Sequence, residues 1–122
     1  MPGWQCTHID DIAAEQWPYW APIRHHFGIQ TFGINAWRGG PGDEVIKRHH
    51  ESDSGHPELY FVIAGDVTFT VGGEGLPAPA GTLVYVEDPD TERVAVATAP
   101  NTVVLSISGG TPSGWDTHYL EG

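Results

Sequence analysis

Short stretches of alternating apolar and polar residues dominate the chain after residue 25. Turns rich in glycine, proline and acidic residues separate these stretches, and alternation with a period of two predicts β-strands. The predicted strands cover residues 26–38, 58–64, 67–71, 82–86, 91–97 and 102–107, with a further short strand that begins at Val45. Short strands at a spacing of roughly ten residues, without helices between them, indicate an antiparallel sandwich or barrel.

Residues 58–71 carry the strongest hairpin signal in the chain. Two apolar strands flank the dipeptide Gly65-Asp66, and the second strand alternates valine and phenylalanine with threonine. A two-residue loop that contains glycine is typical of a tight β-hairpin. We therefore expect these two strands to pair with each other.

Residues 8–20 form the one segment with a helical pattern. Asp10 or Asp11 is a suitable N-cap, and Pro18 ends the segment. The expected organisation is a lead-in with this short helix over residues 1–25, a single β-barrel over residues 26–110, and a tail over residues 111–122.

Composition and charge narrow the class of protein. The chain of 122 residues has the length of one domain, and 39% hydrophobic residues suffice for a packed core. Its net charge of −11 argues against nucleic acids and anionic membranes as partners. No apolar run reaches the roughly 18 residues of a membrane-spanning helix, and the N-terminus lacks the features of a secretory signal. Because Cys6 is alone and forms no internal disulfide, we expect a cytoplasmic protein.

A polar stretch within residues 42–65 concentrates the candidate chemistry. It contains three histidines together with Glu51 and Glu58, just before an apolar strand. Strand alternation puts His56 and Glu58 on one face, and His50 reaches them across the loop. Two imidazoles and a carboxylate are the three-ligand set of open zinc sites and non-haem iron sites. The same composition is also typical of an exposed polar loop, so the metal-free rim of a pocket is the alternative.

The same stretch resembles a known sequence motif. From Gly42 the chain runs through the His49-His50 pair to Glu58, and six residues separate Glu58 from Gly65. In this order and spacing it resembles the first motif of the cupins, which are small RmlC-like jelly-roll barrels. The resemblance covers about residues 30–108. It implies an all-β fold, an antiparallel double-stranded β-helix, with a divalent transition metal in the barrel.

The chain departs from the family pattern in two places. Pro79 to Leu83 resemble the start of the second cupin motif, but Val84 stands where the family has a histidine that binds the metal. In the first motif, adjacent histidines replace a His-x-His pair. These departures predict that the full family metal site is absent, and that a bound metal would use His50, His56 and Glu58.

The direction of Glu58 determines the expected lining of the barrel. If its side chain points inward, strand alternation turns Tyr60 inward as well, and Val84 faces them from another strand. The resemblance adds the strand that carries Gln30, Phe32 and Ile34. The expected ligand-binding residues are therefore Gln30, Phe32, Ile34, His50, His56, Tyr60, Val84 and Arg93, with Glu58 as the candidate acid or base.

Two further side-chain positions bear on partners. Arg93 lies inside a predicted strand, where it would bind a ligand carboxylate or pair with Glu58; an exposed position among the many acidic residues is the favoured interpretation. Leu59, Phe61 and Ile63 make the outer face of their strand apolar, which predicts a homodimer that covers it.

Three functions fit these features. The preferred hypothesis is a barrel that binds a small organic molecule without the full family metal site, with weak acid/base chemistry by Glu58. The second is a metal-dependent, oxygenase-like enzyme that binds iron, manganese, zinc or nickel through His50, His56 and Glu58. The third is a non-catalytic sensor or accessory barrel. Whether the protein is an enzyme stays open at this level.

Overall fold

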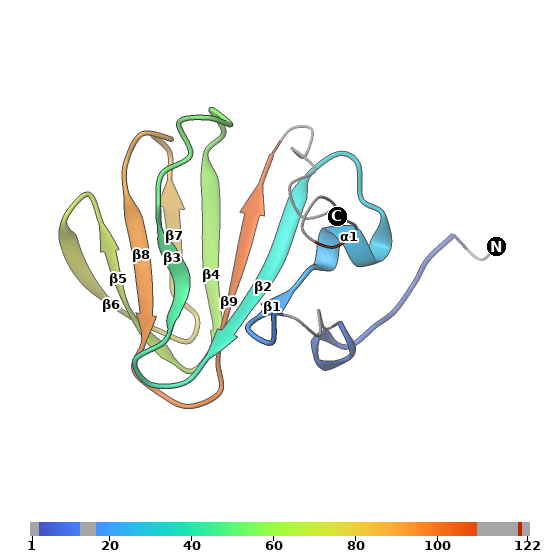
Figure 1. Ribbon diagram of the computed structural model, residues 1–122, viewed down its shortest axis with the longest axis horizontal. Helices are drawn as coiled ribbons and strands as arrows, with labels where there is room; N and C mark the ends of the chain where they lie inside the picture. Colours follow the sequence, from blue (N-terminus) through green and yellow to red (C-terminus); the bar gives the residue numbers. More distant parts are fainter. Residues whose placement is uncertain (1–2, 13–16, 110–119, 121–122) are drawn as a thin grey trace.

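Two antiparallel β-sheets make up most of the protein. The computed structural model describes residues 3–12, 17–109 and Leu120 (Figure 1). The first sheet has the strand order β1-β2-β9-β4-β7, and the second has the order β3-β8-β5-β6. The strands are β1 (Trp20–Ala21), β2 (Gly33–Gly39), β3 (Glu44–His49), β4 (Glu58–Ala64), β5 (Asp66–Val71), β6 (Glu74–Pro79), β7 (Leu83–Val86), β8 (Arg93–Ala97) and β9 (Thr102–Ser108). The predicted all-β, antiparallel jelly-roll class is confirmed.

The main core lies between the two sheets. Tyr60 and Val62 of the first sheet belong to the same buried cluster as Val67 and Phe69 of the second, and none of them is more than 1% exposed. Burial of each large apolar side chain of this kind contributes roughly 1.5–3 kcal/mol. The inward orientation predicted for Tyr60 is confirmed. This part of the barrel is therefore filled by the protein's own side chains.

β4 and β5 do not form the hairpin that the sequence predicts. β4 pairs with β7 and β9, whereas β5 pairs with β6 and β8, so the turn at Gly65 carries the chain from one sheet to the other. Gly65 has a φ of +78°, and a Cβ atom at this position would collide with Thr102. A hairpin and a crossover both need a glycine turn between two apolar strands, so the local pattern does not distinguish them.

The helix predicted over residues 8–20 is wrong in its position. Among the described residues of that range, 8–12 and 17–20, the helical element is one 3₁₀ turn, η1, at Ile9–Asp11. The one α-helix among the described residues, α1, spans Ile23–Phe27. Residues 13–16, at the centre of the predicted helix, lie outside the described residues.

Proline and glycine explain where α1 begins and ends. Pro22 directly precedes the helix, and Gly28 follows it with a φ of +68°, which is a common C-terminal cap. Because this turn and the loop after it occupy the following residues, β2 starts at Gly33 and not at residue 26.

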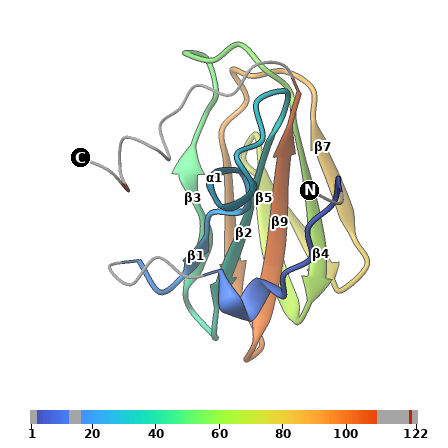
Figure 2. The same cartoon turned by 90° about the vertical axis from the view of Figure 1, so that its right-hand side faces the viewer.

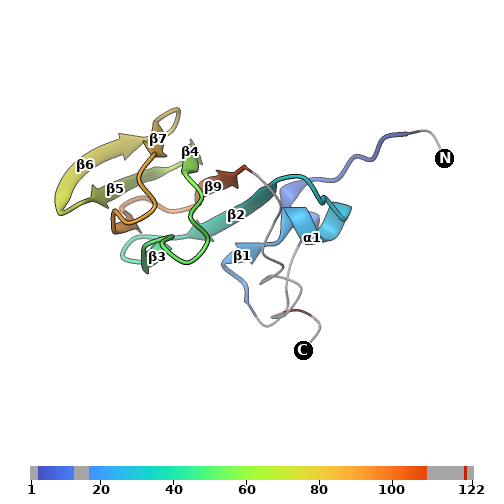
Figure 3. The same ribbon diagram turned by 90° about the horizontal axis from the view of Figure 1, so that it is seen from above.

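The N-terminal elements cover part of the first sheet from outside. Ile12 and Ala21 pack with Ala36 of β2 in a second, smaller buried cluster. Figure 2 shows α1 and β1 beside β2, and Figure 3 shows that they lie on the side of the molecule away from β5 and β6. Of the predicted tail over residues 111–122, only Leu120 is among the described residues. In the described part of the chain, no helix has the length and apolar character needed to cross a membrane.

Candidate functional site

Polar side chains gather where β3 ends and where β4 and β8 begin. His49 and Arg93 are paired positions across the β3–β8 ladder, and Glu58 belongs to the other sheet. A register shift between Ile46 and His49 changes the phase of β3, and the ring of His49 lies 3.7 Å from Glu58 Oε1. We call this group the cup cluster; its members are His49, Glu51, Glu58, Tyr60 and Arg93.

The Arg93–Glu58 pair is the centre of the cup cluster. Arg93 is fully buried, and its Nη1 donates to Glu58 Oε1 at 3.3 Å while its Nε donates to Thr91 O at 3.0 Å. The hydroxyl of Tyr60 donates to the same carboxylate oxygen. The remaining nitrogen of Arg93, Nη2, is buried without a hydrogen-bond partner in the described part of the chain. The favoured sequence interpretation, an exposed Arg93, is therefore wrong.

His49 connects this pair to Glu51. Its Nε2 lies 3.1 Å from Glu51 Oε1, and its Nδ1 lies 2.6 Å from Lys47 O. Burial lowers the pKa of His49, but hydrogen bonds to Glu51 and Glu58 outweigh it and raise the pKa to about 10. The hydrogen bond from His49 lowers the pKa of Glu51. The imidazolium of His49 and the guanidinium of Arg93 thus balance two negative charges, those of the Glu51 and Glu58 carboxylates.

Tyr60 remains a hydrogen-bond donor at this site. Burial and the adjacent charge of Glu58 raise the pKa of its phenol, so the hydroxyl keeps its proton. Its ring packs against Phe69, with the ring centroids 5.1 Å apart, and this contact holds the hydroxyl toward Glu58.

A row of polar side chains adjoins the cup cluster on the inner face of the first sheet. Asn35 and Tyr60 are both paired with Ser106, so the three side chains share one face. The indole nitrogens of Trp20 and Trp37 donate to Asn35 and Ser106, each at 2.9 Å. The sequence analysis missed Asn35 and Ser106. The available signal was the alternation of serines with apolar residues along β9.

Gln30, Phe32 and Ile34 do not line the inner face, so this expectation is wrong. Gln30 and Phe32 are exposed, and Ile34 is half-buried. In β2, Trp37 packs against the core between the sheets, whereas Ala36 packs in the cluster beneath the N-terminal segment. Odd-numbered residues of β2 therefore point inward, so Ile34 has the opposite phase, and Gln30 and Phe32 lie before β2 begins.

His50 and His56 lie outside the cup cluster, although the sequence joins them to Glu58 as a metal set. His50 is exposed, and its Nδ1 accepts a hydrogen bond from the backbone of Ser52 at 3.3 Å. His56 is half-buried, and its backbone N–H donates to Ser54 Oγ. Because the register of β3 shifts before its last residue, His49 takes the inward position that the sequence analysis assigns to its neighbour.

His49, Glu51 and Glu58 are the group of potential metal donors that the described residues bring together, with ligand atoms within 4.8 Å of one another. Imidazole and carboxylate groups suit a transition metal. However, Arg93 is buried against Glu58 at 3.3 Å, and a metal ion there would lie beside this fixed positive charge in a sheltered site. Val84, where the resemblance expects the last ligand, is half-buried and apolar. The residues present therefore do not fit the metal that the resemblance implies.

Protein stability is expected to fall between pH 7 and pH 10 because of His49. Its raised pKa means that this contribution is complete below the ordinary value of 6.5 and is lost as the pH rises through about 10. Because 34% of the His49 side chain meets solvent, which screens the charges, we expect a loss of about 1–2 kcal/mol. Urea denaturation at a series of pH values measures this loss. The variant His49→Gln should show a smaller decline, and a wild-type stability that is constant over this range would contradict the assignment.

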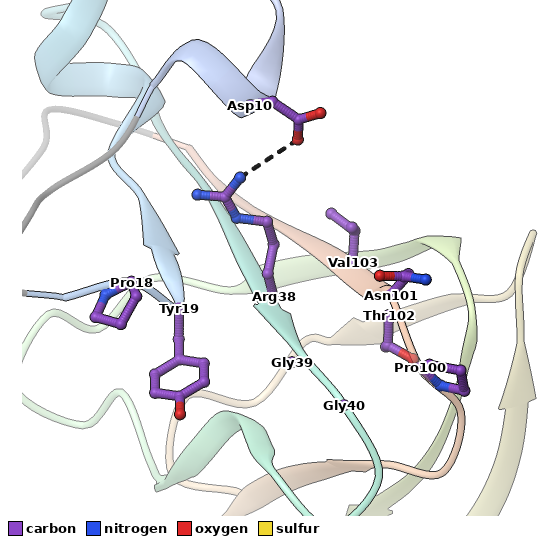
Figure 4. Close-up of a pocket in the computed structure, with 10 residues that line it drawn as sticks. All are labelled: Asp10, Pro18, Tyr19, Arg38, Gly39, Gly40, Pro100, Asn101, Thr102 and Val103. Atoms are coloured by element: carbon purple, nitrogen blue, oxygen red, sulfur yellow. Dashed lines mark hydrogen bonds and ion pairs between the residues drawn. The ribbon is translucent and has the colours of Figure 1, made fainter.

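A separate groove of about 730 Å³ lies at the far end of the first sheet (Figure 4). It adjoins the end of β2 and the start of β9, whereas Glu58 is paired with the last residue of β9. Arg38 points across the groove to Asp10, with 3.4 Å between Nη1 and Oδ1. The groove contains no residue of the cup cluster; it is lined by Asp10, Pro18, Tyr19, Arg38, Gly39, Gly40, Pro100, Asn101, Thr102 and Val103.

Comparisons with known proteins identify the fold. No family model and no curated protein matches the chain. A cupin protein (BF4112) from Bacteroides fragilis aligns at 18% identity over 93% of this chain and 89% of its own, with a TM-score of 0.71. The plu4264 protein from Photorhabdus luminescens aligns at 19% identity over 100% of both chains, with a TM-score of 0.69. KdgF from Halomonas sp. aligns at 18% identity over 70% of this chain and 74% of its own, with a TM-score of 0.59. The chain therefore has the cupin fold that its sequence motifs resemble.

Proposed function

We propose that the protein binds a small polar organic molecule at the cup cluster, without the metal implied by the resemblance. The observation that carries this proposal is the buried Arg93–Glu58 pair. Taking two charges out of water is costly, and apolar residues of similar size often stabilise a fold equally well or better. A charged pair kept inside the barrel, beside the apolar core, is therefore better explained by binding than by stability.

The cup cluster offers both donors and acceptors to a ligand. The carboxylates of Glu51 and Glu58 are acceptors, and Nη2 of Arg93 is a donor without a partner among the described residues, whereas the ring nitrogens of His49 and the hydroxyl of Tyr60 already bond within the protein. The side chain of His49 is 34% exposed and that of Glu58 is 14% exposed, so both are accessible from solvent. Weak acid/base chemistry on a bound molecule would use Glu58, because a carboxylate in a partly desolvated site exchanges protons with a neighbouring ligand.

Two other functions would use the same part of the barrel. A metal-dependent enzyme would need His49, Glu51 and Glu58 as ligands, and the charge of Arg93 opposes that arrangement. A sensor or accessory barrel would bind the same molecule without converting it. Metal analysis of protein purified without a His-tag addresses the first alternative, because near-stoichiometric iron, manganese, zinc or nickel would contradict the metal-free proposal.

Glu58→Gln is expected to weaken ligand binding by about 10–100-fold, because hydrogen bonds to a charged group contribute roughly 1.5–3 kcal/mol. The amide keeps an acceptor for Arg93 and Tyr60, so the fold should persist. Ligand-observed NMR with a library of small polar fragments identifies compounds that bind the wild type. Titration of those compounds into the variant then gives the change in affinity.

Glu92→Gln is the matched control for this measurement. Glu92 accepts from Arg48 at 2.8 Å in an exposed pair outside the cup cluster, so its removal should leave fragment binding unchanged. Circular dichroism and thermal melting report whether each variant folds. An unfolded Glu58→Gln variant would assign Glu58 a structural role and contradict the proposed site.

We also propose that the protein forms a homodimer through the outer face of β4 and β7. Leu59 lies opposite Tyr85, and Phe61 lies opposite Leu83, so the four side chains share one uncharged face. Leu83 and Tyr85 are each 60% exposed, and β7 is an edge strand of its sheet. Two copies with a net charge of −11 repel each other, so an apolar face without acidic residues is the surface best suited to self-association.

Leu83→Glu is expected to shift the protein from dimer to monomer, because it adds a like charge to an apolar interface. Light scattering at micromolar protein concentration gives the mass of each variant. Leu76→Glu is the control, since Leu76 is also exposed but lies on β6 in the other sheet. A wild-type protein that is monomeric under these conditions would contradict the dimer proposal.

A further inference from the structure

Arg93 has a hydrogen-bond donor that the protein leaves unused. Its Nε donates to Thr91 O and its Nη1 donates to Glu58, but its Nη2 is buried without a partner among the described residues. Buried polar groups without a hydrogen bond are uncommon in native proteins, because they lose the hydrogen bonds of water and gain none. An acceptor atom on a bound ligand would satisfy this donor.

The guanidinium of Arg93 is the fixed positive charge of the cup cluster. Arg93 is paired with His49 across the β3–β8 ladder and contacts Glu58 of the other sheet. A guanidinium stays protonated at every physiological pH, and its planar shape directs several N–H groups at defined angles. It therefore provides a permanent charge beside the carboxylates that a metal ion would otherwise need as ligands.

The charges of the cup cluster favour an uncharged ligand. The carboxylates of Glu51 and Glu58 lie together in the cup cluster, so a ligand anion would be placed beside two negative charges in a sheltered site. A ligand cation would be placed beside the guanidinium. A neutral molecule with a strong acceptor oxygen avoids both penalties and satisfies Nη2.

As an extension of the proposed function, we propose that the guanidinium of Arg93 supplies the positive charge of the cup cluster in place of a metal ion. Its Nη2 donates a hydrogen bond to the carbonyl oxygen of an uncharged ligand. Small ketones, amides, esters and lactones are the ligand class. The guanidinium stabilises the partial negative charge on such an oxygen, because a fixed charge in a sheltered site interacts more strongly than one in water.

The first test compares ketones with alkenes of the same shape. Cyclopentanone and cyclohexanone are titrated into the wild-type protein alongside methylenecyclopentane and methylenecyclohexane, with binding followed by ¹H–¹⁵N NMR. We expect each ketone to bind about 10–100-fold more tightly than its alkene, as for a hydrogen bond to a charged group. The Nε and Nη resonances of Arg93 should shift with the ketones only.

The second test introduces a metal ligand at the position of the cation. Arg93→His places an imidazole across the ladder from His49, beside the carboxylate oxygens of Glu51 and Glu58 that could bind a metal ion. We expect this variant to bind Zn²⁺ about 100-fold more tightly than the wild type in calorimetric titration, since it gains a ligand and loses a positive charge. Arg48→His, at an exposed position on β3, is the control and should bind Zn²⁺ like the wild type.

The outcomes separate this inference from the proposed function. Equal binding of ketones and alkenes would overturn the carbonyl contact but leave a small-molecule site at the cup cluster. Binding of neither would overturn this inference, and the fragment titrations of the wild type and Glu58→Gln decide the proposed function separately. Tight stoichiometric zinc binding by the wild type would show that Arg93 does not take the place of a metal. If Arg93→His fails to fold, the two wild-type measurements still decide.

Discussion

Replacing Arg93 by methionine is expected to lower the free energy of unfolding by about 3–5 kcal/mol, the usual cost of breaking a buried ion pair. Arg93 is fully buried, and its loss leaves the carboxylate of Glu58 in the barrel with the hydroxyl of Tyr60 and the more distant ring of His49 as its partners. The destabilisation comes mainly from this carboxylate, which is largely shielded from water and loses its buried cation, so that His49 is left, among the described residues, as the one positive charge beside both Glu51 and Glu58. Urea denaturation of the wild type and the variant at pH 7 gives the difference.

Two control variants distinguish this cause from simple loss of volume. Adding Glu58→Gln to the Arg93→Met variant removes the uncompensated charge, and we expect the double variant to regain about half or more of the lost stability. Arg48→Met, which breaks the exposed pair with Glu92, should cost less than about 1 kcal/mol. A cost below about 1 kcal/mol for Arg93→Met would mean that the buried pair is not formed in solution.

Gly65→Ala is expected to destabilise the protein by about 2–4 kcal/mol. At a φ of +78° an alanine side chain is strained, and its Cβ would in addition collide with the backbone and side chain of Thr102. Because Thr102 begins β9 and Gly65 connects the two sheets, neither segment moves aside without disturbing the strands it belongs to. Thermal and urea denaturation measure the change.

Gly73→Ala is the matched control for this crossover. Gly73 has a similar φ of +82°, but a Cβ atom there meets nothing within 4 Å. Its substitution should therefore cost only the conformational strain, about 1–2 kcal/mol. Equal effects of the two substitutions would contradict the claim that close contact with Thr102 defines the turn.

The cup cluster occupies one end of the barrel, and packed side chains fill the part below it. Tyr60 belongs to both, because its ring packs against Phe69 while its hydroxyl donates to Glu58. Below this level the interior is filled by side chains such as Val62 and Val104. A ligand is therefore confined to the end of the barrel where the cup cluster lies, and this is why a polar ligand suits the protein better than a large apolar one.

The sequence by itself determined the fold class and the face of β4 to which each of its side chains points. Period-two alternation is a local property, so it identifies β4 and turns Glu58, Tyr60 and Val62 to one face without knowledge of the rest of the molecule. The spacing from Glu58 to Gly65 and the resemblance to the cupins led to the same jelly roll that the structure shows.

Only the tertiary structure decided which residues meet at the cup. A shift of register in β3 turns His49 inward in place of His50. A change of phase by one residue moves every side chain of a strand to the opposite face, and in β2 the odd-numbered residues therefore point inward. Arg93 and Glu58 are 35 residues apart in sequence, and no local pattern selects their pairing over an exposed arginine. Partners of this kind are set by ladder registers and by the packing of two sheets, and these depend on the whole chain at once.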